Sequence, residues 1–132
     1  MPTVVLGYVP KPEGEAALAA SISEALLRGA DLVVVNAHRA HRGDDEAGAR
    51  LLSELDEVRS RVEAAGVAVD IRHPEGGLEA SEDLLAIAEE VKAELVVIGL
   101  RRRTPVGKLI LGSNAQRILL DAHCPVLAVK SD

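Results

Sequence analysis

Short apolar runs alternate with amphipathic segments along the chain, and this alternation restricts the fold more than any other feature. The runs Thr3–Val9, Asp31–Ala37 and Glu94–Gly99 are rich in valine, leucine and isoleucine. Near-continuous apolar runs of this length are typical of strands that are buried on both faces. Because helix-like segments separate the runs, the sequence predicts an α/β fold, with an open parallel sheet and helices on both of its faces.

We expect residues 1–132 to form one domain. The expected strands cover residues 3–9, 31–37, 67–72, 94–99 and 124–130, and the expected helices lie within residues 10–30, 49–66, 78–93 and 113–123. Gly29 and Gly66 stand where the first two of these helices should stop. Ser81 and Ser113 are candidate N-cap residues for the last two.

Charge and side-chain inventory exclude several classes of function. The 132 residues include 21 acidic and 15 basic side chains, a net charge of −6, which argues against binding of the whole chain to nucleic acid or to a membrane surface. Tyr8 is the only aromatic residue, so single-stranded nucleic acid would find no stacking platform. Cys124 is the only cysteine, which excludes an internal disulfide. Without a signal-like N-terminus or an apolar stretch of about eighteen residues, a cytoplasmic protein is expected.

The segment that follows the fourth expected strand carries the richest chemistry. Gly99 closes that strand, and Gly112 with Ser113 opens the next helix, where free N–H groups, a hydroxyl and the helix dipole suit an anion. Between them, Arg101, Arg102 and Arg103 add charges that can pair with phosphate oxygens. The same residues also fit a plain turn, an N-cap and a solvated basic loop. The spacing does not fit a Walker A loop.

Other candidate residues point to no site. The four histidines, His38, His41, His73 and His123, are scattered and are expected in loops or on the surface. Cys124 begins an expected core strand and is interpreted as a buried, inert thiol. Residues 44–46 are interpreted as a solvated acidic stretch and not as a metal site. No Ser-His-Asp signature accompanies Ser113, so we expect no catalytic residues. Because the histidines are scattered and the acidic stretch is solvated, we expect no metal site.

Over essentially its whole length, the chain resembles the universal stress proteins of the UspA type. That family typically carries G-x-x-G, then nine residues, then G-[ST], a short helix and a final strand similar to "PVLVV". Gly99 matches the first glycine, and Gly112 with Ser113 matches the closing pair at the right distance. The final "CPVLAV", residues 124–129, fits the last strand.

This resemblance implies a strand order of 3-2-1-4-5 and, in the nucleotide-binding branch, an ATP or AMP site, with Mg²⁺, between the first and fourth strands. Glycine-loop amides and the Ser113 hydroxyl would then hold phosphates, and the backbone near Ala37 would face adenine. The implied site comprises Val9, Ala37, Gly99, Arg101, Arg102, Arg103, Gly112, Ser113 and Asn114.

Two positions depart from the family pattern. Binding members usually place an aspartate at the end of the first strand, where this chain has Val9 followed by Pro10. Arg102 replaces the second glycine of G-x-x-G. If that backbone needs a positive φ, arginine costs about 1 kcal/mol or more; if φ is negative, its guanidinium can reach phosphate. The sequence leaves both alternatives open.

A stress-response regulatory or binding module is the function that the sequence favours. The alternative is a nucleotide-free dimer that acts through protein–protein contacts, and a slow nucleotide hydrolase is the third reading, for which no general base stands out. In the implied order the fifth strand is an edge, and its Val126, Leu127 and Val129 would make it an apolar one. We therefore predict a homodimer formed through residues 124–129.

Overall fold

Strands and helices alternate along the part of the chain that the structure, a computed structural model, describes: residues 2–36, 46–74, 79–100 and 111–131. The strands are β1 (Thr3–Tyr8), β2 (Asp31–Asn36), β3 (Val69–Arg72), β4 (Leu95–Leu100) and β5 (Val126–Lys130). The helices are α1 (Pro12–Arg28), α2 (Glu46–Ala64), α3 (Ala80–Glu90) and α4 (Ser113–Asp121). The predicted α/β fold is confirmed.

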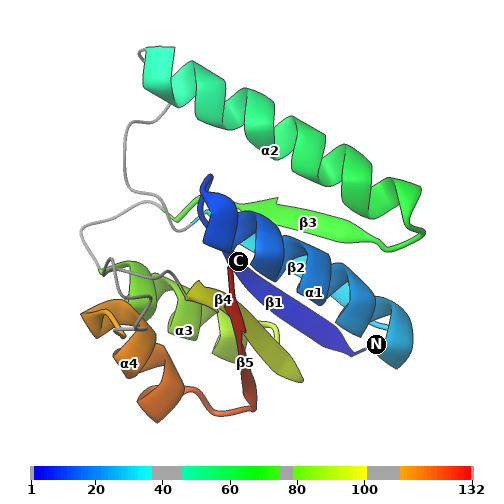
Figure 1. Cartoon of the computed structure of the whole chain (residues 1–132). Coiled ribbons are helices and arrows are strands. Elements are labelled where there is room, and N and C mark those ends of the chain that lie inside the picture. The colour runs from blue at the N-terminus through cyan, green and yellow to red at the C-terminus, as the bar shows by residue number, and fades with distance from the viewer. Residues whose placement is uncertain (1, 37–45, 75–78, 101–110, 132) are drawn as a thin grey trace.

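All five strands are parallel and lie in the order β3-β2-β1-β4-β5 (Figure 1). The central strand β1 pairs with β2 from Thr3 against Asp31 to Tyr8 against Asn36, and with β4 on its other side. The strand order implied by the family resemblance is thus confirmed. β1 and β4, where the implied site lies, are both interior strands.

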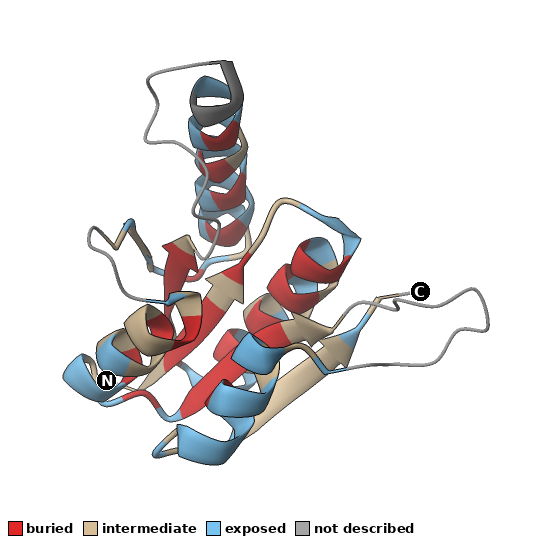
Figure 2. Cartoon of the chain, turned by 90° about the vertical axis from the view of Figure 1, so that its left-hand side faces the viewer, coloured by how far each residue is buried: buried red, intermediate tan, exposed pale blue. Residues whose placement is uncertain are grey.

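Successive residues of β1 face two separate hydrophobic cores. Val4, Leu6 and Tyr8 pack with buried residues of α1 and α2 on one face of the sheet. Val5 belongs to the second core, on the other face, with residues of α3 and α4. Figure 2 shows the buried residues running through the central strands and along one side of α2. Two-sided burial explains why the central strands read as near-continuous apolar runs.

Several element boundaries differ from the prediction. α2 begins at Glu46, three residues before the predicted start, because a first helical turn needs no apolar side chain of its own. β1 ends at Tyr8 and β2 at Asn36, while Ala37 lies outside the described residues. Gly29 and Gly66 both have positive φ at the ends of helices, as expected. No helix in the described ranges has both the length and the hydropathy required to cross a bilayer.

Both predicted serine N-caps are wrong. The N-cap of α3 is Glu79, so Ser81 lies inside the first turn. The N-cap of α4 is Gly112, and Ser113 is the first helical residue. Neither N-cap residue makes a side-chain capping hydrogen bond. The backbone enters each helix one or two residues earlier than the side-chain preference indicated.

Candidate nucleotide site at the ends of β1 and β4

The carboxyl ends of β1 and β4 lie side by side where the strand order reverses. From β1 the chain proceeds to β2 on one side, whereas β4 leads to β5 on the other. In open parallel sheets, ligands bind beyond the carboxyl ends of the strands at such a switch point. Val9, which follows β1, and Gly99, near the end of β4, flank this point.

Gly99 is small because the first turn of α1 lies against it. A Cβ atom at this position would come within 2.2 Å of the Glu13 carbonyl oxygen. In the same way, a Cβ atom on Gly14 would come within 1.7 Å of the Val9 carbonyl oxygen. Close packing of α1 against the ends of β1 and β4 therefore accounts for both glycines, without any ligand at Gly99.

A cavity of about 160 Å³ lies on the α3/α4 face of this point. It is lined by Gly7, Val9, Ala80, Ser81, Leu84, Ile98, Gly99, Asn114, Ala115 and Ile118. Three residues of the predicted site, Val9, Gly99 and Asn114, thus line one cavity. Gly112 and Ser113 adjoin it in sequence but do not line it. The remaining predicted residues, Ala37, Arg101, Arg102 and Arg103, lie outside the described residues.

The N-terminus of α4 ends beside this cavity. No side chain caps the helix at Gly112, and its first turn contains no acidic residue. The first N–H groups of a helix have no partner within the helix, so those of Ser113, Asn114 and Ala115 are available to an acceptor. Because Asn114 and Ala115 also line the cavity, an anion bound at this helix end would lie at the edge of the cavity.

Ser81 is the functional candidate that the sequence reasoning missed. Its exposure is 2%, and it lines the cavity from the first turn of α3. Its hydroxyl makes no hydrogen bond within the described part of the chain. Every fully buried side-chain oxygen in the described part of the chain has a hydrogen-bond partner. Because the Ser81 hydroxyl has none, its oxygen must be partly accessible. The sequence offered only its place near a helix start, which suggested an N-cap.

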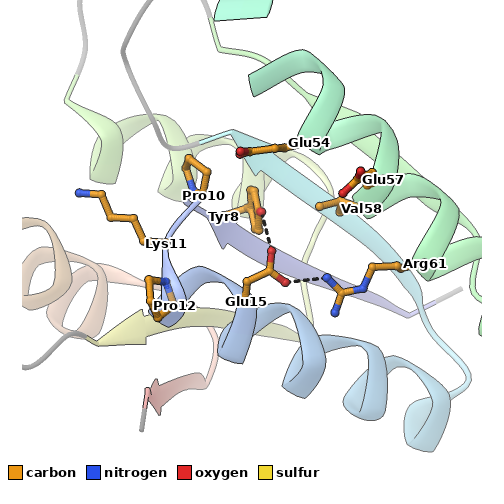
Figure 3. A pocket seen from close by; sticks show the side chains of 9 residues that line it. All are labelled: Tyr8, Pro10, Lys11, Pro12, Glu15, Glu54, Glu57, Val58 and Arg61. Atoms are coloured by element: carbon orange, nitrogen blue, oxygen red, sulfur yellow. Dashed lines mark hydrogen bonds and ion pairs between the residues drawn. The ribbon is translucent and has the colours of Figure 1, made fainter. Parts of the chain in front are cut away.

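A second cavity, of about 370 Å³, lies on the opposite face between α1 and α2 (Figure 3). Its lining consists of Tyr8, Pro10, Lys11, Pro12, Glu15, Glu54, Glu57, Val58 and Arg61. The Tyr8 hydroxyl donates to Glu15 Oε1 at 3.0 Å, and Arg61 Nη1 donates to Glu15 Oε2 at 2.6 Å. Each oxygen of the Glu15 carboxylate thus has its own donor.

The phenol of Tyr8 is held in its neutral form. Its side chain is almost completely buried, at 1% exposure. Burial raises the pKa of the phenol well above its ordinary value, and the hydrogen bond to Glu15 and the negative charges of Glu15 and Glu54 raise it further. Arg61 opposes this effect only in part. The Tyr8 hydroxyl is therefore a neutral hydrogen-bond donor to the Glu15 carboxylate.

The other singled-out residues form no cluster. His73 and His123 are exposed, as expected, whereas His38 and His41 lie outside the described residues. Cys124 is only half-buried, not fully buried as predicted, and this burial raises the pKa of its thiol. Within the described ranges, no group of three histidine, cysteine or acidic side chains could hold a metal ion.

Comparison with known proteins agrees with this architecture. The model described as "Universal stress protein family" matches residues 1–130. A universal stress protein from Mycolicibacterium smegmatis is 45% identical over 129 residues, which cover 96% of each chain.

Solved structures add information on ligands. The universal stress protein from Archaeoglobus fulgidus in complex with dAMP superposes with a TM-score of 0.74 at 27% identity, covering 98% of both chains. A universal stress protein in complex with cAMP also has a TM-score of 0.74, at 25% identity, and covers 99% of this chain and 98% of that one. dAMP and cAMP are ligands of those two proteins.

Proposed function

The chain belongs to the universal stress protein family, and we propose that it is a regulatory module that binds an adenine nucleotide at the ends of β1 and β4. The observation that carries this proposal is the cavity at the switch point, which adjoins the uncapped N-terminus of α4. Two relatives of similar fold were solved with dAMP and cAMP, which supports a ligand of this class. In this proposal residues 1–132 act as one domain.

Different parts of the site bind different parts of the nucleotide. The N–H groups at the start of α4 and the Ser113 hydroxyl donate hydrogen bonds to phosphate oxygens. Arg101, Arg102 and Arg103 supply balancing charge, and the backbone near Ala37 faces the adenine. Val9 contributes an apolar wall in place of a carboxylate. Since the described cavity lining includes no acidic side chain, Mg²⁺ is expected to enter only with the phosphates of ATP.

Calorimetric titration with ATP, AMP and cAMP, each with and without Mg²⁺, tests the proposal directly. We expect heat from a single site of micromolar affinity for at least one of these nucleotides. Absence of heat from every nucleotide at millimolar concentration would refute nucleotide binding and favour a nucleotide-free module.

A substitution at Gly112 tests whether the phosphates bind at the N-terminus of α4. The φ of Gly112 is −71°, which any residue can adopt, so Gly112→Val introduces no backbone strain. The added methyl groups block the approach of a phosphate to the helix amides, and we expect binding to be abolished while the fold is retained. Unchanged affinity in Gly112→Val would place the phosphates elsewhere.

Arg102→Gly restores the family pattern and decides between the two alternatives left open by the sequence. Weaker nucleotide binding would identify the arginine as a phosphate contact, with a loss of about 1.5–3 kcal/mol for a charged hydrogen bond. Tighter binding would identify it as an obstruction. We propose the contact, because three adjacent arginines repel one another unless an anion lies among them.

We propose binding without catalysis. The described cavity lining contains no histidine, aspartate, glutamate or cysteine that could act as a general base. Incubation with ATP should therefore release no phosphate above the buffer rate. Release that is lost in Gly112→Val would instead support a hydrolase.

We also propose a homodimer formed through β5. The two edges of the sheet differ: β3 carries Asp70 and Arg72, and Arg72 pairs with Asp70 at 2.9 Å and with Glu90 at 2.6 Å. Val126–Val129 of β5 are uncharged and only half-buried. An apolar edge favours pairing with a like strand. Light scattering at micromolar concentration should give twice the 13.9 kDa chain mass, and a single-chain mass would refute the dimer.

A further inference from the structure

Two buried serines of the chain differ in what their hydroxyls do. Ser21 in α1 is 0% exposed, and its Oγ donates to the Leu18 carbonyl oxygen at 2.9 Å. Ser81 in α3 is 2% exposed and lines the 160 Å³ cavity, but its hydroxyl has no partner in the described part of the chain. A buried hydroxyl is normally hydrogen-bonded. A hydrogen-bond partner for the Ser81 hydroxyl would therefore have to lie in the cavity that Ser81 lines.

The remaining cavity wall indicates which chemistry that partner has. Apart from Ser81 and Asn114, the described lining side chains are apolar or absent, and none is charged. Burying a phosphate against such a wall is costly, whereas an uncharged ring or sugar is suited to it. The volume of about 160 Å³ is also well below the roughly 300–1,000 Å³ of sites that enclose a whole drug-sized ligand. Only part of a nucleotide fits inside.

We propose that Ser81 is a ligand-contacting, specificity-determining residue that hydrogen-bonds the uncharged nucleoside part of the nucleotide inside this cavity. The proposal rests on the proposed function. A hydroxyl both donates and accepts, so Ser81 can bond either a ring nitrogen of the base or a hydroxyl of the sugar. Val9, just after β1, offers no hydrogen-bonding side chain, so Ser81 supplies the polar contact from α3 instead.

The test is Ser81→Ala, with Ser21→Ala as the matched control. Each variant removes one oxygen from a buried serine of a helix, on opposite faces of the sheet. By calorimetry we expect Ser81→Ala to bind adenosine, AMP and dAMP about 5- to 10-fold more weakly, the loss of one neutral hydrogen bond. Ser21→Ala should bind all three like the wild type.

The pattern over the three ligands identifies the contact. An equal loss for all three ligands assigns Ser81 to the base or to the 3′-hydroxyl, and a loss for adenosine and AMP with none for dAMP assigns it to the 2′-hydroxyl. A loss for AMP and dAMP with none for adenosine would mean a phosphate contact and would overturn the proposal. Equal affinity of Ser81→Ala and the wild type for all three would also overturn it, while leaving the proposed function standing. If the wild type binds none of them, this proposal fails, and the proposed function fails with it unless ATP or cAMP binds.

Unfolding of the ligand-free protein in urea separates this role from a structural one. Ser81→Ala removes no hydrogen bond within the described chain and introduces a better helix former, so its midpoint should equal or exceed that of the wild type. A lower midpoint would show that the hydroxyl supports the fold, and the proposal would be wrong.

Discussion

The two cavities at the end of β1 lie on opposite faces of the sheet and have opposite chemistry. Tyr8 lines the cavity between α1 and α2, where each oxygen of the Glu15 carboxylate already has a donor. The next residue, Val9, lines the cavity between α3 and α4, whose described walls carry no charge and include Ser81, a residue with no hydrogen bond in the described part of the chain. In the larger and more polar of the two cavities, Tyr8, Glu15 and Arg61 are thus already hydrogen-bonded to one another.

This difference separates a lining whose charged groups are paired with one another from a lining without charge. Donors and acceptors that satisfy one another hold secondary structure elements together and must be separated before a ligand can use them. Tyr8, Glu15 and Arg61 connect β1, α1 and α2 in this way. A hydroxyl left without a partner in an apolar wall is better suited to a ligand. We therefore expect substitutions around Glu15 to change stability, and substitutions around Ser81 to change binding.

Gly14→Ala should have the largest effect on stability, because backbone atoms of Val9 occupy the space that its Cβ would need. Its Cβ would lie 1.7 Å from the Val9 carbonyl oxygen, so the turn between β1 and α1 must move. We expect the free energy of unfolding in urea to fall by about 2–4 kcal/mol. Nucleotide binding should weaken as well, since Val9 lines the α3/α4 cavity.

Gly7→Ala is the control for this prediction. Its Cβ would be crowded by the end of the Leu84 side chain, at 3.0 Å, which can shift, and would make an ordinary contact with Ile98 at 3.7 Å. The loss of stability should be clearly smaller than in Gly14→Ala. Equal losses would mean that the backbone contact at Val9 is not the cause.

The sequence predicted the layers of the fold well because burial on both faces leaves apolar runs such as Thr3–Val9 and Glu94–Gly99. The strand order came from the family resemblance, since periodicity does not identify neighbours. The second cavity was missed because Glu15 and Arg61 are 46 positions apart and meet only after folding. Ser81 was taken for a cap because local preference cannot distinguish a hydroxyl that bonds backbone from one that faces a cavity.

Alkaline pH should weaken the fold through Tyr8. Its folded-state pKa lies above the unfolded value of about 10. Its contribution to stability is therefore complete below pH 10 and is lost as pH rises from there toward the folded-state pKa. Over that window, the free energy of unfolding should fall by about 1.4 kcal/mol for each pH unit. Urea unfolding at a series of pH values measures this slope.

Absorbance provides a direct check of the same prediction. The chain has one tyrosine and no tryptophan, so the phenolate band in the ultraviolet reports Tyr8 alone. Phenolate should form only together with unfolding. A band that rises near pH 10 while the protein stays folded would show that the phenol is not protected. The Tyr8→Phe variant should lack both the band and the alkaline slope attributed to Tyr8.

At neutral pH, Tyr8→Phe should have a moderate effect that is confined to one face of the sheet. The ring remains in the core, and the change removes only the 3.0 Å hydrogen bond to Glu15. We expect a loss of about 1 kcal/mol in the free energy of unfolding. Affinity for AMP should be unchanged, because Tyr8 does not line the α3/α4 cavity. Altered affinity would show that the two cavities are coupled through β1.

Arg61→Ala should have the smallest effect, although its ion pair is the shorter of the two contacts to Glu15. The Arg61 and Glu15 side chains are 50% and 48% exposed, so water solvates both charges when they separate and salt screens them when they meet. We expect a loss of about 0.5 kcal/mol or less, which shrinks further when unfolding is measured in 1 M NaCl. Tyr8, by contrast, should keep its effect in salt because its hydroxyl is buried. A loss in Arg61→Ala that exceeds the loss in Tyr8→Phe would mean that the distance of a contact, and not its burial, sets its contribution here.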